Sequence, residues 1–309
     1  FRNGRFLPPS ALGAAGWDGK PGIALARGGV ILNDGRNRRA LLGDDGRPQP
    51  LPGLPEVRGM TSAWRSQDGR DLLVLVAGRL YRCLDGAWSS RDLAPAMKGN
   101  QICVLGDRRG RIWVRSERSL VRLAAIDAAI EDLSGRLELS MSNTGCLVED
   151  AQGRVWTNTA GSLAWYDDAG AGLLSEANGL PQGGANVLLV DRENGLWIGG
   201  EGVHRQMGRF AWEGYTRRQG LPAHVVWSLH RSADGLLWAG TAAGLAVGDG
   251  RRWQTVPGTT QRQFMGFAED AAGSLWIAPV TGLAEPPWLM RRRAPGRTPF
   301  SRANSSPAR

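Results

Sequence analysis

The sequence has few of the residues that build metal sites or disulfide frameworks. Its 309 residues include three cysteines and three histidines, with no Cys-x-x-Cys pair and no Cys/His spacing typical of zinc ligands. We therefore expect no metal and no cofactor. An odd number of cysteines cannot form a complete disulfide framework, so buried thiols are the simpler expectation. A bond between Cys103 and Cys146 stays open, because each lies ten residues before a repeated tryptophan.

The sequence also lacks a long hydrophobic run. No stretch of about 18 apolar residues is present that could cross a membrane, and no signal peptide is recognisable. The first residue is Phe rather than Met. We expect the chain to be a piece of a longer protein, so these absences say little about where that protein resides.

Lysine is nearly absent, since Lys20 and Lys98 are the only two, and arginine carries almost all of the positive charge. The formal net charge of +9 suggests a nucleic-acid partner at first sight. However, the segment after Glu285 holds six arginines and no acidic residue, which leaves +3 for the rest of the chain. Phosphate binding needs a clustered basic stripe, and none is present, so we expect no nucleic-acid partner.

Glycine and tryptophan are abundant instead, with 44 and 13 residues. The phrase Asp-x-x-Gly-x-apolar-Trp, or a close variant, recurs five times, with 43, 41, 41 and 38 residues between successive tryptophans. Weaker copies upstream place Leu73 and Ala24 at the tryptophan position. An internal repeat of about 40 residues indicates a repeat architecture, in which each unit forms one small structural module. The seven resulting anchor positions are 24, 73, 113, 156, 197, 238 and 276.

Each unit is expected to fold into a small antiparallel sheet. An apolar stretch forms the first strand, Asp-x-x-Gly makes a turn, and the Trp-containing stretch forms the second strand. A further turn such as Asp249-Gly250 leads to an outer strand. A sheet of this size cannot cover both of its faces. Stacking such sheets around an axis, with indole rings between them, solves this problem.

The sequence therefore predicts an all-β fold, a single seven-bladed β-propeller over residues 1–288 with blades of three to four antiparallel strands. Residues 289–309, rich in Arg, Pro and Ser, are predicted to be a disordered basic tail. The phrase Asn3-Gly4-Arg5-Phe6 copies the outer-strand phrase Gly208-Arg209-Phe210. We therefore expect residues 1–7 to supply the outer strand of the last blade.

Two segments resemble a known family. Gly220-Leu221-Pro222 with residues 234–245 (DGLLWAGTAAGL), and Gly179-Leu180-Pro181 with residues 195–203 (GLWIGGEGV), are similar to the two-component regulator propeller repeat. The match is strong over residues 145–284, fair over 54–144, and weak before that.

In that family such propellers are periplasmic sensors of membrane-bound proteins, and many relatives respond to carbohydrates. The output is a histidine kinase or a diguanylate cyclase. The resemblance implies that this chain is a non-enzymatic input domain of an inner-membrane protein, whose output domain is in the parent chain. A homodimer stays open. The chain departs from the family after Trp288, where no immunoglobulin-like module, membrane helix or output segment follows.

Propellers bind ligands where their loops converge on the axis at one rim. Amides and an exposed indole suit a small molecule or an oligosaccharide, because they match sugar hydroxyls and the flat face of a sugar ring. The repeated aspartates are expected to shape turns, and we assign no catalytic residue or metal ligand, because an active site needs one constellation rather than several copies. The predicted ligand-binding residues are Asn100, Gln101, Asn143, Thr144, Asn186, His224, Trp227 and Gln263.

Two other functions stay open at this point. One is a propeller enzyme resembling the virginiamycin B lyases, whose blades carry phrases like Gly153-Arg154-Val155-Trp156. That function needs a histidine and a carboxylate that meet near the axis with a metal, whereas we expect His230 to pack in the interior and His204 to lie at the surface. The other is a scaffold for protein–protein interaction, which would show a broad apolar rim.

Overall fold

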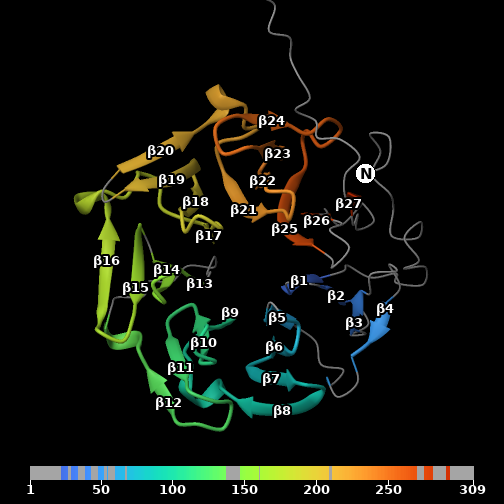
Figure 1. Ribbon diagram of the computed structural model, residues 1–309, viewed down its shortest axis with the longest axis vertical. Coiled ribbons are helices and arrows are strands. Elements are labelled where there is room, and N and C mark those ends of the chain that lie inside the picture. Colours follow the sequence, from blue (N-terminus) through green and yellow to red (C-terminus); the bar gives the residue numbers. More distant parts are fainter. Residues whose placement is uncertain are drawn as a thin grey trace, which may run out of the picture.

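The chain forms a closed ring of small antiparallel sheets (Figure 1). The computed structural model describes residues 22–26, 29–33, 39–42, 48–51, 54, 60–66, 68–136, 147–159, 161–208, 211–269, 275–280 and 290–292. These residues contain seven sheets, six of four strands and one of three, as many sheets as the repeat has units. The prediction of an all-β propeller is confirmed.

The first four blades are built from strands β1 to β16, each blade from strands consecutive in the chain. Blade 1 contains β1 (Gly22–Ala26), β2 (Gly29–Asn33), β3 (Arg39–Leu42) and β4 (Pro48–Pro50). Blade 2 contains β5 (Met60–Arg65), β6 (Asp71–Val76), β7 (Arg79–Leu84) and β8 (Ala87–Asp92). Blade 3 contains β9 (Gln101–Gly106), β10 (Ile112–Ser116), β11 (Leu120–Leu123) and β12 (Ile130–Asp132). Blade 4 contains β13 (Leu147–Glu149), β14 (Val155–Thr159), β15 (Ser162–Tyr166) and β16 (Ala171–Ser175).

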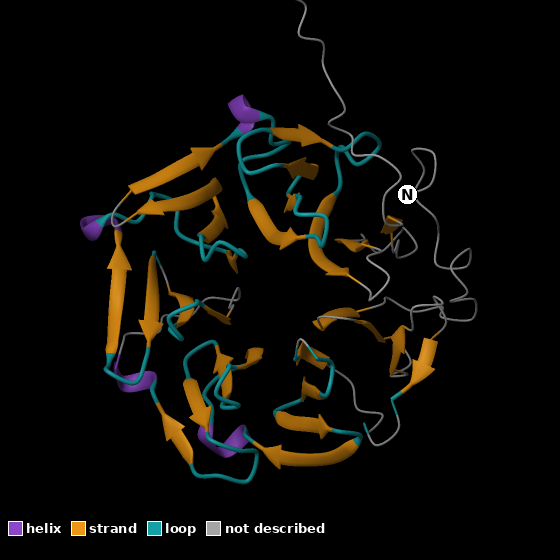
Figure 2. Cartoon of the chain, in the orientation of Figure 1, coloured by secondary structure: helices purple, strands orange, loops and turns teal. Residues whose placement is uncertain are grey.

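The last three blades complete the ring, and short 3-10 turns follow some outer strands (Figure 2). Blade 5 contains β17 (Val187–Val190), β18 (Leu196–Gly200), β19 (Gly202–Gly208) and β20 (Ala211–Tyr215). Blade 6 contains β21 (Val226–Arg231), β22 (Leu237–Thr241), β23 (Gly244–Gly248) and β24 (Trp253–Thr255). Blade 7 contains β25 (Gln263–Glu269), β26 (Leu275–Val280) and β27 (Met290–Arg292). The 3-10 turns are η2 (Ala94–Ala96), η3 (Ser134–Arg136), η4 (Glu176–Asn178) and η5 (Arg217–Gln219).

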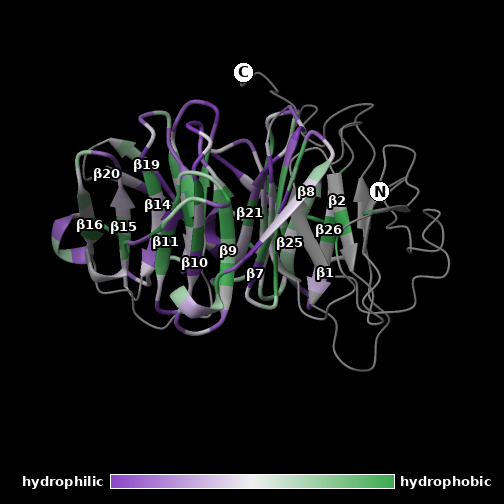
Figure 3. Ribbon diagram, turned by 90° about the horizontal axis from the view of Figure 1, so that it is seen from below, coloured by the Kyte–Doolittle hydropathy of each residue, from purple (hydrophilic) through white to green (hydrophobic). Residues whose placement is uncertain are grey.

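The first strand of every blade lies nearest the axis, and the later strands follow outward (Figure 1). Each innermost strand contacts the innermost strands of both neighbours, and β25 contacts β1, so the ring closes. The loops at the two ends of the ring are largely hydrophilic, whereas hydrophobic residues lie in the strands (Figure 3). In the described part of the chain, no helix could span a bilayer.

Packing between blades depends on the anchor tryptophans, as the repeat predicts. Trp113 is fully buried and packs against Leu147, Val155 and Tyr166 of the next blade, with 6.3 Å between the ring centroids of Trp113 and Tyr166. Trp197 packs in the same way against Leu237 of blade 6. Removing these large apolar surfaces from water is the main term that holds neighbouring blades together.

The anchor predicted in the first unit is wrong. Ala24 lies on β1, the innermost strand, and pairs with Ile31 on β2, which takes the buried second-strand position. Only two residues separate β1 from β2, so this hairpin has no Asp-x-x-Gly turn. The Asp18-Gly19 pair that suggested the match precedes β1 instead of joining it to β2.

The boundary of the predicted tail also needs correction. Met290–Arg292 form β27, which pairs with β26, so this stretch belongs to blade 7 rather than to a disordered segment. Residues 1–7, predicted to supply the outer strand of that blade, lie outside the described residues, as do residues 293–309. Whether Cys103 and Cys146 are bonded, which the sequence leaves open, is equally untested, because Cys146 lies outside the described residues.

Candidate functional site

The ring has two faces that differ in their loops. We call the face where each innermost strand begins the entry face, and the opposite face, which carries the Asp-x-x-Gly turns, the turn face. Hydrogen bonds between neighbouring blades connect residues on the same face. On the entry face, Asn186, just before β17, donates to the carbonyl of Val226 at the start of β21. On the turn face, the amide of Ala151 donates to Asn194 of the next blade.

The turn face is occupied by structural hydrogen bonds. In Asp107, Asp150 and Asp191, Oδ1 accepts backbone N–H groups of the turn, and Oδ2 accepts the indole N–H of the anchor tryptophan six residues later at 2.7–2.8 Å. In blade 6, Ser232 takes the place of the aspartate and accepts the indole N–H of Trp238 at 3.1 Å. The prediction that the repeated aspartates shape turns is confirmed for these three, whereas Asp270, the fourth, lies outside the described residues.

Further bonds on the turn face tie adjacent blades together. The backbone N–H of Arg108 donates to Oε2 of Glu149 in the next blade, at 3.0 Å. Burial raises the pKa of the Glu149 carboxyl, and this hydrogen bond partly opposes the rise. In the same way, Glu269 of blade 7 accepts the backbone N–H of Ala233 in blade 6. Among the described residues, no three His, Cys, Asp or Glu side chains gather closely enough to hold a metal ion.

The entry face carries a different feature, a series of β-bulges at the start of the innermost strands. In blades 2, 3, 6 and 7 the pairing with the second strand skips one residue of the innermost strand. A bulge leaves one residue outside the ladder and re-aims its side chain, and bulges are common beside binding sites. The skipped residues are Thr61, Ile102, Trp227 and Met265.

Two of these residues present large apolar groups near the axis. Met265, on the innermost strand β25, is 53% exposed, which is unusual for a methionine on a central strand. Trp227 holds the equivalent position on the neighbouring innermost strand β21 and is half-buried. Its indole N–H has no hydrogen-bond partner in the described part of the chain. Together they offer an aromatic and a thioether group at the entry end of blades 6 and 7.

The structure places the predicted ligand-binding residues that it describes at the entry ends of innermost strands. His224 is exposed in the loop before β21, and its carbonyl accepts the backbone N–H of Gly202 at 2.6 Å. Gln263 is exposed at the start of β25. Asn100 is exposed and donates to Glu117 at 2.9 Å. Gln101 opens β9. Whether any of them binds a ligand stays a prediction.

Some of these residues have structural roles, and others cannot be placed. The amide of Asn186 is half-buried and bridges blades 5 and 6 through the carbonyl of Val226 at 3.3 Å, so it is committed to the fold. The side chain of Gln101, and the whole of Asn143 and Thr144, lie outside the described residues.

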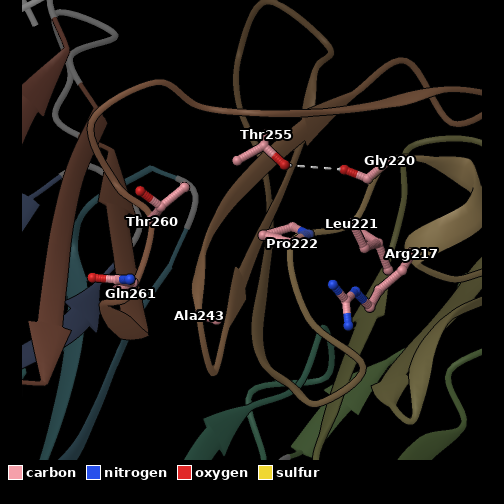
Figure 4. A pocket seen from close by; sticks show the side chains of 8 residues that line it. All are labelled: Arg217, Gly220, Leu221, Pro222, Ala243, Thr255, Thr260 and Gln261. Carbon is pink, nitrogen blue, oxygen red and sulfur yellow. Dashed lines mark hydrogen bonds between the residues drawn. The ribbon is translucent and has the colours of Figure 1, made fainter.

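The Gly-Leu-Pro lead of the repeat borders a shallow hollow on the entry face, of about 460 Å³ (Figure 4). Leu221 is buried in the core between blades 5 and 6, and the Gly220 carbonyl accepts the hydroxyl of Thr255 at 3.3 Å. The Gly-Leu-Pro segment therefore has a structural role, since it packs between two blades and bonds to the outer strand of blade 6. The hollow is lined by Arg217, Gly220, Leu221, Pro222, Ala243, Thr255, Thr260 and Gln261.

A buried polar cluster between blades 3 and 4 escaped the sequence analysis. Arg115, Thr157 and Asn158 have essentially no exposed surface, and Arg115 donates to both of the others. Two residues after the anchor tryptophan, blades 5 and 6 have glycines, Gly199 and Gly240, whereas blades 3 and 4 have Arg115 and Asn158. This departure from the repeat is the signal that could have revealed the cluster.

Comparison with known proteins shows the fold. No protein-family model matches the chain, and no curated protein matches it in sequence. The extracellular domain of a hybrid two-component system protein from B. thetaiotaomicron is 14% identical with a TM-score of 0.67, over 86% of this chain and 38% of that one. Virginiamycin B lyase from Staphylococcus aureus is 16% identical with a TM-score of 0.65, over 88% and 94%. YCF48 bound to D1 peptide is 14% identical with a TM-score of 0.66, over 90% and 95%.

These similarities define the class to which the chain belongs by fold, the β-propellers. The similar structures include an extracellular domain of a two-component system protein and a lyase, so fold alone does not select the function. This chain spans about two fifths of the two-component protein's domain. The choice between functions depends on the residues of the entry face and on one pair at the turn face.

Proposed function

We propose that this chain is a ligand-binding sensor propeller, the periplasmic input module of a membrane-bound signalling protein, and that its ligand is a sugar bound at the entry face. The main support is the group of β-bulges that re-aim side chains at the entry ends of innermost strands, with Trp227 and Met265 in adjacent blades. The bulge recurs in blades 2, 3, 6 and 7, and in blades 6 and 7 it carries a large apolar side chain. Irregular positions that cluster at one rim are typical of a binding site.

The chemistry of this rim suits a carbohydrate. The half-buried Trp227 offers part of an apolar ring for the face of a sugar, while its indole nitrogen is buried. The exposed His224 and Gln263 lie at the entry ends of the same two blades and add polar groups for hydroxyls. Few of these groups carry charge, which favours a neutral hydroxyl-rich ligand over a nucleotide.

A parent signalling protein is the second part of this proposal. The fold is shared with the extracellular domain of a hybrid two-component system protein, of which this chain spans 38%. We infer that the output domain belongs to a longer parent chain and that the propeller passes the signal on by contact with it, with or without a second copy. No catalysis takes place in the propeller in this account.

A thermal-shift titration with a panel of neutral gluco-, xylo- and galacto-oligosaccharides tests the sugar site. We expect at least one to raise the melting temperature of the wild type in proportion to the logarithm of its concentration. Trp227→Ala should remove this shift. Trp212→Ala is the matched control, since Trp212 is also half-buried with an unpartnered indole N–H but lies on the outer strand β20. Equal shifts in both variants, or no shift with any sugar, would contradict the proposal.

One observation favours a lyase as the second candidate. His230 and Glu269 lie on adjacent innermost strands, with 3.4 Å between Nε2 and Oε2, the kind of pair that acid–base chemistry uses. Both also have structural roles, since His230 stacks on Phe267 and Glu269 accepts the backbone N–H of Ala233. Incubation with quinupristin, followed by liquid chromatography, separates the two functions. We expect no conversion, whereas conversion lost in His230→Ala would favour the lyase.

A further inference from the structure

Arg115 is a buried cation without a counter-ion. It lies on β10, and its side chain has no exposed surface. Within the part of the chain that the structure describes, no carboxylate pairs with it, and the only groups that accept its hydrogens are the hydroxyl of Thr157 at 2.6 Å and Oδ1 of Asn158 at 2.8 Å. Arginines of protein interiors are nearly always paired with an anion, because burying an isolated charge is costly.

The unsatisfied atoms have a specific arrangement. Both accepted hydrogens come from Nη1, while Nε and Nη2 have no hydrogen-bond partner among the described residues. In a guanidinium group, the N–H bonds of Nε and Nη2 are parallel and lie along one edge. This edge is a two-pronged donor that matches the two oxygens of a carboxylate. Nη1 thus forms the hydrogen bonds of the Arg115 guanidinium to Thr157 and Asn158, whereas the edge formed by Nε and Nη2, which could bind a carboxylate through two hydrogen bonds, has no partner among the described residues.

The surroundings hold the guanidinium in place. Asn158 not only accepts from Arg115 but also donates from Nδ2 to the carbonyl of Ala185, in the loop that enters blade 5. The cluster therefore connects three consecutive blades. At the equivalent positions of blades 5 and 6, a Cβ on Gly199 would meet Val187 at 2.7 Å, and a Cβ on Gly240 would meet Phe264 O at 2.4 Å. A Cβ on Gly199 would also meet Val226 of the next blade at 2.8 Å, so the interfaces that follow blades 5 and 6 have no room for a side chain at this position, whereas the interface between blades 3 and 4 holds Arg115.

We propose that this cluster is a carboxylate-binding site, in which the Nε–Nη2 edge of Arg115 binds the ligand's carboxylate while Thr157 and Asn158 fix the guanidinium. The site is separate from the sugar-binding rim near Trp227, and it does not depend on the signalling role. A bound carboxylate supplies the missing counter-ion. Because Arg115 has no exposed surface, an anion must enter through a local opening of the interface, so association is slow compared with binding at an open cleft.

Thermal-shift titrations at constant ionic strength test this site, with acetate, galacturonate and neutral galactose as probes. For the wild type we expect stabilisation by a carboxylate and none by galactose at the same concentration. A shift with both carboxylates points to a small free anion, and a shift with galacturonate alone points to the carboxylate of an acidic sugar. Arg115→Met should remove the shift. Arg115→Lys should weaken binding about tenfold or more, because an ammonium group keeps the charge but loses the two-pronged edge.

The variants also separate a binding site from a structural arginine. Arg115→Met removes an unpaired buried charge but also takes a donor from the buried Thr157 and Asn158, so the shift with anion is the decisive readout, and not the melting temperature without it. The control is Arg82→Met: Arg82 is also largely buried but forms two bonds with Asp71 at 3.0 and 2.8 Å, so its loss should lower the melting temperature and leave the anion shift unchanged. Absence of a carboxylate shift in the wild type, or an equal shift in Arg115→Met, would overturn the site. A neutral-sugar shift that depends on Trp227 would still support the sensor function in that case.

Discussion

Trp197 donates its indole N–H to Oδ2 of Asp191 across 2.7 Å, and this bond joins the two ends of the repeated phrase. Oδ1 of the same carboxylate accepts the backbone N–H of Gly195 at 2.7 Å. One buried side chain thus fixes both the turn and the orientation of the ring that fills the space beside the next blade. The relation recurs at Trp113 and Trp156. The phrase therefore specifies a folding unit rather than a catalytic group.

Replacing Asp191 by alanine should destabilise the protein by about 2–4 kcal/mol, because a buried indole N–H and the turn amide lose their acceptor together. Arg205 and Arg231, at 3.6 and 3.5 Å from Oδ2, would also lose their negative partner. Urea unfolding of both proteins gives the difference.

The control for this change is Asp249→Ala. Asp249 also accepts turn amides, those of Arg251 and Arg252, but it is exposed and bonds to no indole in the described structure. We expect a loss of no more than about 1 kcal/mol. Similar losses for the two variants would show that the indole bond adds nothing to the stability of a blade.

Gly240 should not tolerate a side chain. A Cβ at this position would lie 2.3 Å from Oγ of Ser228 and 2.4 Å from the carbonyl of Phe264 in the next blade. Gly240→Ala is expected to cost about 1–3 kcal/mol through overpacking. Gly208→Ala is the control, because a Cβ there meets no atom within 4 Å. A chemical-denaturation midpoint unchanged in Gly240→Ala would mean that the interface between blades 6 and 7 is looser than described.

The raised pKa of Tyr215 predicts that the protein loses stability at alkaline pH. Burial, assisted by the nearby carboxylate of Glu213, raises the pKa of this phenol to about 12, and its hydroxyl donates to the carbonyl of Gly250. An unfolded tyrosine ionises near pH 10. Between about pH 10 and 12 the unfolded phenol therefore loses its proton while the folded one keeps it, so stability is full below pH 10 and falls as the pH rises through this range.

The midpoint of urea unfolding, measured from pH 8 to pH 12, checks this expectation. The wild type should lose stability more steeply above pH 10 than Tyr215→Phe, which has no proton to lose at this position. Parallel curves for the two proteins would assign the alkaline transition to other groups.

Most of the fold follows from the repeat, and the reason is local. Asp, Gly and Trp within seven residues fix a hairpin on their own, so five units can be recognised without knowledge of their neighbours. The first unit was misassigned because its hairpin turns through only two residues and shows no such phrase. Met290–Arg292 was misassigned because its arginines resemble those of the basic segment that follows, although pairing with β26 holds the stretch in blade 7.

The candidate sites follow less well from the sequence, also for a physical reason. A search for repetition finds what every blade shares, whereas a ligand site is built from residues that differ between blades. Arg115 and Asn158 stand where blades 5 and 6 have glycine, and their contact crosses 43 residues of chain. The bulges at Trp227 and Met265 arise from strand register, which no single residue type specifies.

Hydrogen exchange with the neutral oligosaccharide that stabilises the protein most gives the most direct test of a ligand site on the entry face. We expect the sugar to slow amide exchange at the entry ends of β21 and β25 and in the loops that lead into them, with no change at the Asp-x-x-Gly turns. Slower exchange confined to those turns, around Asp150 and Asp191, would contradict this account.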